Sequence, residues 1–370
     1  EEELAWISEF RNSNLLASED CRRAMRLAYH SGYLLMIAND QAIPHEKKLL
    51  HALVRVCNSV VPTSTLQRLL ISCEIPMLLL GFRAENSPRV APWETIIDRL
   101  GSICDEAFDG EGMMASSELS DFAEVLASLA RMIQLANLVN PGVRLPNGIL
   151  HQFQWAVRQL LLIYFADGLL LGGQPRQLGD DLIAVLLKLG GDPSDVRLAR
   201  HLGLLWDSEG AFAAELAIGA KRPQASFHSE WAQVAVLRSG WGRNRRELGV
   251  RVDGTRVELA LQSCGAPVLR GAMEFVLEVD GVCVKPAGKW IETCWQSDSD
   301  ADYLEIELEM NDGWRIQRQF CVSRRSGAVL IADVVLGSTI SDVRQTIKLK
   351  AASDATFNPA GDGRELFVVT

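Results

Sequence analysis

Residues 150–165 carry side chains whose types and spacing suit proton transfer beside a bound anion. His151, Trp155 and Arg158 follow one another at intervals of four and three residues, so they share one helix face, and Tyr164 follows near the helix end. An imidazole and a phenol can exchange protons with a ligand, which makes His151 and Tyr164 the candidate catalytic pair. Trp155 can stack on a flat ligand such as a sugar ring, and Arg158 can hold a carboxylate. The alternative is a polar seam between packed helices, with Trp155 in the core.

A basic cluster further along the chain is the second candidate site. Its arginines are Arg243, Arg245 and Arg246, with Arg251 and Arg256 nearby. Guanidinium groups bind sulfates and carboxylates through paired hydrogen bonds, so Arg243 and Arg245 are candidate ligand-binding residues. Arg270, together with Trp290 and Trp295, can line a cleft for a glycan. The alternatives are a solvated basic loop and tryptophans that pack in a core.

Composition argues against several other classes of function. The chain has 370 residues, a mass of 40.8 kDa and a net charge of −10, which disfavours broad nucleic-acid binding. No run reaches the roughly 20 apolar residues that cross a bilayer, so no membrane partner is expected. The eight cysteines form no C-x-x-C pair, and neither a phosphate-binding glycine loop nor a G-x-S-x-G elbow is present. The compartment stays open: cytoplasmic for a full-length chain, periplasmic or secreted for a mature fragment.

Residues 1–225 have the apolar spacing of successive amphipathic helices. The segment 122–133 is the clearest case, and the breaks between such segments contain proline or glycine. Further candidate helices cover about 15–38, 46–60, 63–83, 92–108, 150–165, 179–190 and 195–206. Helices joined by short loops predict antiparallel pairs, so we expect an α-helical domain over residues 1–225, an incomplete α/α toroid.

From residue 226 to 370 the apolar residues alternate with polar ones. Asp253-Gly254, Asp280-Gly281 and Asp312-Gly313 interrupt the alternating runs. Asp-Gly is typical of a tight hairpin turn, because both central residues must adopt positive φ angles. This pattern predicts an antiparallel β-sandwich domain over residues 226–370.

Several of these segments resemble the heparinase II/III-like family of polysaccharide lyases. Residues 231–242 (WAQVAVLRSGWG) are similar to the first strand of that family's C-terminal domain, and residues 272–288 to its next hairpin. Residues 314–337 resemble the following strand pair, and residues 165–168 (FADG) resemble a turn late in the helical domain. The resemblance implies an α/α toroid followed by a β-sandwich. It also implies β-elimination on uronic-acid polysaccharides, and hence an anionic polysaccharide as partner.

The chain departs from the family's pattern at three positions that usually supply catalytic or metal-binding groups. Leu269 stands in the segment that contains a histidine in the family. Lys285 replaces an aspartate of the next hairpin, and Gln317 replaces a histidine of the later strand. Leucine, lysine and glutamine cannot complete a zinc site, so no metal and no cofactor are expected.

Three hypotheses for function remain open at this stage. The leading one is a lyase-related protein that binds anionic polysaccharide, uronate or sulfated, with degenerate or weak β-elimination activity. The second is an active carbon–oxygen lyase whose base and acid are His151 and Tyr164. The third is a non-enzymatic scaffold whose surfaces bind protein partners.

Overall fold

The structure is a computed structural model in which two compact units are distinguished. It describes residues 61–81, 91–139, 145–165, 171, 180–204, 221–242, 244–337, 341–352, 356–359 and 366–369. The helical unit comprises Glu1–Gly112, Asp121–Val157 and Val185–Gly190, and the sheet unit comprises Met113–Ser120, Arg158–Ala184 and Gly191–Thr370. The helices predicted at 15–38 and 46–60 lie outside the described residues.

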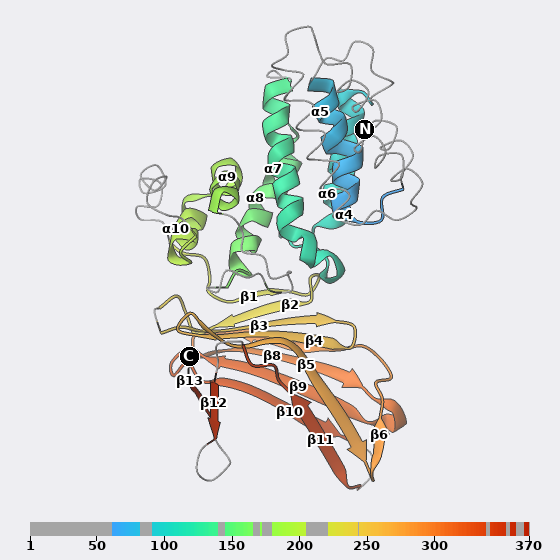
Figure 1. Cartoon of the computed structure of the whole chain (residues 1–370), viewed down its shortest axis with the longest axis vertical. Helices are drawn as coiled ribbons and strands as arrows, with labels where there is room; N and C mark the ends of the chain where they lie inside the picture. The colour runs from blue at the N-terminus through green and yellow to red at the C-terminus, as the bar shows by residue number, and fades with distance from the viewer. Residues whose placement is uncertain are drawn as a thin grey trace, which may run out of the picture. The chain divides into compact units, whose positions relative to one another are not determined.

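The helical unit is built from the helices labelled in Figure 1, of which α6 and α7 bury one face and expose the other. Its described elements are α4 (Thr65–Leu69), the π-helix η1 (Leu70–Glu74), α5 (Ile75–Gly81), α6 (Trp93–Ala107), α7 (Phe122–Val139), most of α8 (Asn147–Leu162) and part of α9 (Asp180–Gly190). Helices α4 and α5 pack on α7. The predicted helix at 122–133 is confirmed, because it forms the first part of α7 and its apolar positions are buried.

One buried carboxylate lies in the core of the helical unit. The π-helix η1 ends at Glu74, whose side chain is fully buried. Ser128 Oγ donates a hydrogen bond to Glu74 at 2.5 Å, and Arg131 Nε donates another at 2.5 Å. A buried charge needs such partners, so these three residues tie the π-helix to α7.

The sheet unit contains antiparallel strands and helix α10 (Pro193–His201) (Figure 1). Its strands are β1 (Phe227–Ser229), β2 (Val234–Arg238), β3 (Arg246–Asp253), β4 (Arg256–Ser263), β5 (Ala266–Val279), β6 (Val282–Val284), β7 (Ile291–Ser297), β8 (Ala301–Glu309), β9 (Arg315–Ser323), β10 (Val329–Leu336), β11 (Val343–Lys348), β12 (Thr356–Pro359) and β13 (Leu366–Val369). The first sheet has the order β1-β2-β3-β4-β5-β11, with β6 also paired to β5. The second has the order β10-β9-β8-β7, and β12 pairs with β13.

The Asp-Gly turns connect neighbouring antiparallel strands. Asp280 and Gly281 have φ angles of 49° and 80°, and they join β5 to β6. Asp312 and Gly313 have φ angles of 61° and 77°, and they join β8 to β9. An aspartate tolerates positive φ better than most residues, and glycine adopts it freely, which is why this dipeptide marks the turns.

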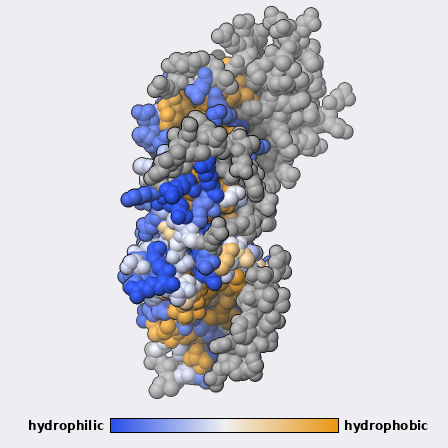
Figure 2. All heavy atoms as spheres, turned by 90° about the vertical axis from the view of Figure 1, so that its left-hand side faces the viewer, coloured by the Kyte–Doolittle hydropathy of each residue, from blue (hydrophilic) through white to orange (hydrophobic). Residues whose placement is uncertain are grey.

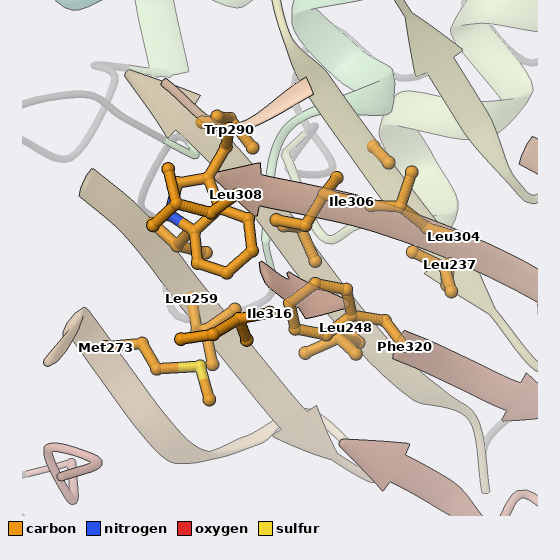
Figure 3. Close-up of a cluster of buried hydrophobic side chains, with 14 of the residues drawn as sticks. Leu237, Leu248, Leu259, Met273, Trp290, Leu304, Ile306, Leu308, Ile316 and Phe320 are labelled. Atoms are coloured by element: carbon orange, nitrogen blue, oxygen red, sulfur yellow. The ribbon is translucent and has the colours of Figure 1, made fainter. Parts of the chain in front are cut away.

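The two sheets share one hydrophobic core (Figure 3). The first sheet contributes side chains such as Leu237, Leu248 and Leu259, and the second contributes Ile306 and Phe320. In β8 and β9 the buried residues alternate with more exposed positions, as the strands of a sheet with one buried face do. The predicted order of helices followed by antiparallel sheets is therefore confirmed, whereas closure of the helices into a toroid stays a prediction.

The other face of the first sheet also packs against chain segments of the sheet unit. Val234 and Val236 of β2 are buried although they do not belong to the shared core. Gly249 of β3 faces Phe165 and Leu171, and a Cβ there would lie 2.6 Å from the Phe165 ring. Glycine is required because any side chain would displace the phenylalanine.

The surface of the sheet unit combines polar and apolar regions (Figure 2). Its exposed large apolar side chains include Val276, Val282, Ile291, Leu330, Val334, Val343, Ile347 and Leu349. Scattered apolar side chains are normal on protein surfaces. Among the described helices, none has both the length and the apolar composition that crossing a membrane would demand.

Candidate functional site

A fully buried arginine, Arg238, organises the end of strand β2. Its Nε donates to Glu247 Oε1 at 3.0 Å, and its two Nη atoms donate to the carbonyls of Ala225 at 2.9 Å and Leu162 at 2.7 Å. The guanidinium also lies 4.9 Å from the ring of Trp241. Arg238 and Trp241 come from the motif R-x-G-W, and these contacts fix the loop that follows β2.

Glu247 of strand β3 accepts hydrogen bonds from two guanidinium groups, those of Arg238 and Arg245. Arg245 Nε donates to the same oxygen, Oε1, at 2.8 Å, and the carboxylate is fully buried. The second oxygen, Oε2, has no hydrogen-bond partner in the described part of the chain. One carboxylate therefore compensates both Arg238 and Arg245.

His201, the last residue of α10, lies between two arginines. Arg222 Nη1 is 3.1 Å from its Nδ1, and Arg245 Nη1 is 3.5 Å from its Nε2. The indole of Trp241 meets the imidazole edge-on, with ring centroids 5.7 Å apart. Burial lowers the pKa of His201, and the charges of Arg222 and Arg245 lower it further. A neutral imidazole has only one acceptor nitrogen, so it can accept from only one of the two guanidiniums.

These residues form a group that we call the His201 cluster. It comprises His201, Arg222, Arg238, Trp241, Arg245 and Glu247. Asp302 also approaches, because it accepts from the main-chain N–H of Arg238 at 2.9 Å, but it forms its own ion pair with Arg324 at 2.6 Å. Among the described residues, the cluster thus holds three guanidiniums and one carboxylate. Such a surplus of positive charge is suited to an anion.

The sequence identified only part of this cluster. Arg245 was predicted as a ligand-binding residue, and Arg243 lies outside the described residues. His201 and Arg222 were not predicted, since they are separated in sequence from the arginines near 245. The signal available was indirect: a lysine-arginine pair before Pro223, where the helical pattern gives way to the strands.

The predicted catalytic pair falls in different units. His151 is exposed on α8, in the helical unit, and Trp155 on the same helix is 48% exposed. Trp155 is therefore not a core residue. Tyr164 belongs to the sheet unit, is 5% exposed, and its carbonyl faces Arg238 Nη2 at 3.4 Å.

Arg158 is held by the acidic start of helix α10. Its Nε donates to Asp195 at 2.7 Å, and its Nη2 donates to Asp192 and to Ser194 Oγ. Asp195 is 2% exposed, so this ion pair is partly buried. An anionic ligand at Arg158 would have to compete with two carboxylates.

Arg270 lies on β5 beside an aromatic ring. Its guanidinium is 5.8 Å from the centroid of Phe165, and its main-chain N–H donates to the Lys350 carbonyl at 3.0 Å. A cation over an aromatic face is an attractive arrangement that also positions the side chain. The turn predicted at Asp167-Gly168 lies outside the described residues.

The three positions that the sequence resemblance singles out, Leu269, Lys285 and Gln317, have ordinary structural surroundings. Leu269 is 9% exposed and forms an isolated bridge with Ala351. Lys285 is exposed after β6, and Gln317 of β9 donates to Glu307 of β8 at 3.0 Å. Within the part of the chain that the structure covers, no three His, Cys, Asp or Glu side chains converge in a way that could hold a metal ion.

The fold of helices followed by antiparallel sheets is similar to that of several solved structures. A crystal structure of heparinase III matches with a TM-score of 0.68 at 10% identity over 96% of this chain. A heparinase III gene product matches with a TM-score of 0.60 at 10% identity over 92% of this chain. Heparan sulfate lyase HepC from Pedobacter heparinus matches with a TM-score of 0.59 at 14% identity over 96%.

These matches establish the fold. The chain spans 62% of the length of each of these three proteins. No family model matches the sequence, and no curated protein matches it.

Proposed function

We propose that this chain is a polysaccharide lyase-related protein that binds anionic polysaccharide, uronate or sulfated, and has weak or no β-elimination activity. The observation that carries the proposal is the fold match to heparinase III, with a TM-score of 0.68 over 96% of the chain. In this proposal residues 1–225 form an incomplete α/α toroid and residues 226–370 form the sandwich. Shared fold alone does not assign a reaction, so the residues decide the rest.

The proposed loss of activity rests on chemistry at three positions. β-Elimination removes a weakly acidic proton next to a carboxylate, which requires a base, an acid and donors that stabilise the developing charge. Leu269, Lys285 and Gln317 stand where the family has such groups or metal ligands. Gln317 moreover donates to Glu307, and leucine can neither donate nor accept a proton.

Release of unsaturated uronate and retention of polysaccharide test this proposal together. The chain is incubated with heparan sulfate and with alginate, with and without a chelator, and is also passed over immobilised heparan sulfate. We expect salt-sensitive retention and little or no product. Rapid turnover that persists in the presence of the chelator would overturn the proposal that the chain has weak or no β-elimination activity. Absence of retention, with a stable protein partner in pull-downs, would favour the scaffold hypothesis instead.

An active lyase that uses helix α8 is the second candidate. The observation that favours it is the exposure of His151 and Trp155 on neighbouring turns of that helix. In this case His151→Ala should abolish turnover while the protein stays folded. Gln154→Ala is the matched control, because this side chain is also exposed on α8. Unchanged turnover of the His151 variant would exclude the residue as the base.

A further inference from the structure

We infer that the His201 cluster is an oxyanion subsite, which takes a sulfate or carboxylate group of an acidic saccharide beside His201, on the donors of Arg222 and Arg245 that the imidazole leaves free. The inference rests on the proposed function for its saccharide, and on the geometry of the cluster for its anion. The predicted ligand-binding residues included Arg245, but His201, Arg222 and Trp241 give the site its shape.

Arg222 and Arg245 have N–H donors that the contacts described above do not use. Arg245 uses Nε for Glu247 and directs Nη1 toward His201. Arg222 uses Nη1 for His201 and for the Trp241 carbonyl at 3.2 Å, whereas its Nε and Nη2 have no hydrogen-bond partner among the described residues. The Arg222 side chain is exposed to solvent, whereas the Arg245 side chain is only 10% exposed. A tetrahedral sulfate or a planar carboxylate accepts from two guanidiniums at once.

The walls of the subsite are fixed before a ligand arrives. Trp241 donates its indole N–H to the Pro223 carbonyl at 2.9 Å, and Arg238 lies against its ring. His201 meets the edge of the same indole. Because these contacts hold the segments around Arg222 and Arg245, binding an anion needs little ordering of the chain.

The end of helix α10 does not balance the charge of the cluster. The C-terminus of a helix carries a partial negative charge of about half an electron. The cluster has three guanidiniums against the single carboxylate of Glu247, which leaves two positive charges among the described groups. The helix end therefore offsets only a minor part of this surplus, and an oxyanion can offset the rest.

Calorimetric titration tests the subsite with three probes: a heparan sulfate oligosaccharide, its desulfated counterpart and inorganic sulfate. Arg222→Gln removes one donor of the subsite. Arg325→Gln is the matched control, because Arg325 is 83% exposed and its ion-pair partner among the described residues is a surface aspartate, Asp300. We expect Arg222→Gln to weaken the affinity for the sulfated oligosaccharide about tenfold, which is the usual effect of losing a charged hydrogen bond. The control should change this affinity less than about twofold.

The outcomes separate the subsite from the proposed function. Equal weakening by both variants would mean diffuse attraction and would overturn the subsite. Strong oligosaccharide binding that is unchanged in Arg222→Gln would also overturn the subsite, but it would support the proposed function. If no oligosaccharide binds, inorganic sulfate still decides: a shift of the His201 ring resonances in the wild type, lost in Arg222→Gln, supports the subsite although the proposed function fails. If no oligosaccharide binds and sulfate does not shift the His201 resonances, both the subsite and the proposed function are overturned.

Discussion

The two ends of helix α10 hold arginines in opposite charge environments. At the N-terminal end a single guanidinium, that of Arg158, pairs with Asp192 and Asp195. At the C-terminal end His201 lies between Arg222 and Arg245, and the carboxylate of Glu247 is shared by Arg238 and Arg245. Acidic groups suit a helix N-terminus and basic groups suit a C-terminus, so both ends follow the helix dipole.

The difference between the ends indicates which one is structural. Asp192 caps the helix by accepting from the main-chain N–H groups of Ser194 and Asp195, and the side chain of Asp195 accepts in turn from the N–H of Asp192. Both carboxylates at this end pair with Arg158 and accept hydrogen bonds from main-chain N–H groups. At the C-terminal end Arg222 has no carboxylate partner among the described residues, and an unpaired guanidinium beside a second one is better explained by a ligand than by stability.

Replacing Arg238 should produce the largest effect. Arg238→Met leaves the buried Glu247 with only Arg245 and removes the donors to two carbonyls. Breaking a buried ion pair from one side costs about 3–5 kcal/mol, so the urea midpoint should fall sharply. Arg325→Gln, at an exposed pair, should leave the midpoint unchanged. A similar midpoint for both variants would show that the buried contacts of Arg238 contribute little to stability.

Replacing Asp195 should have a moderate effect at the other end. Asp195→Asn weakens the buried contact with Arg158, and the expected cost is about 1–3 kcal/mol in the free energy of unfolding. Asp300→Asn is the control, because its ion pair with Arg325 lies on the surface, where Asp300 is 61% exposed. Urea unfolding of both variants measures the difference. An equal cost would mean that burial of Asp195 contributes nothing.

Much of the fold follows from sequence, because it depends on neighbouring residues. Helical spacing predicts α7, and alternation with Asp-Gly turns predicts the hairpins at Asp280 and Asp312. Both signals are local, so they can be read without knowing which elements pack together. The same logic predicted that His151 and Trp155 share one face of a helix, as α8 shows.

The His201 cluster could not be predicted in this way. Its members come from the end of α10, the segment before β1 and the loop between β2 and β3. Arg238 illustrates the difficulty: the motif R-x-G-W is visible in sequence, but its contact with the Leu162 carbonyl spans 76 residues. Pairing between distant segments is set by tertiary packing, so charge composition alone gave only Arg245.

The pH dependence of stability should differ between the two ends, beginning with Asp192. Burial alone would raise the pKa of Asp192, but hydrogen bonds from Ser194, the Asp195 N–H and Arg158 outweigh it and lower the pKa to about 2. The unfolded pKa is about 3.9, so the stabilisation is present above pH 4 and is lost as pH falls toward about 2. Carboxyl resonances of Asp192 should titrate in that acidic range. Titration near pH 4 would contradict the capping arrangement.

The smallest expected effect is at His201, and it tests the C-terminal end directly. Burial, then the charges of Arg222 and Arg245, lower its pKa below the ordinary value, while Glu247 opposes them and Arg238 adds to them. The folded protein therefore binds this proton less readily than the unfolded chain, and stability falls as pH drops below about 6.5. Arg222→Gln removes one cause, so the pKa of His201 should rise toward its ordinary value and the loss of stability should become shallower.

Ring resonances of His201, followed by NMR across this pH range, measure the change. Arg325→Gln removes the same charge elsewhere and should leave the titration in place. Saturating inorganic sulfate should act in the same direction as Arg222→Gln, because an anion bound to the guanidiniums beside His201 opposes the field that disfavours the imidazolium. Sulfate should then have little further effect in the variant. If neither the substitution nor sulfate moves the titration, the charge of Arg222 does not set the pKa of His201. The two ends of α10 would then differ in burial and not in the charges around them.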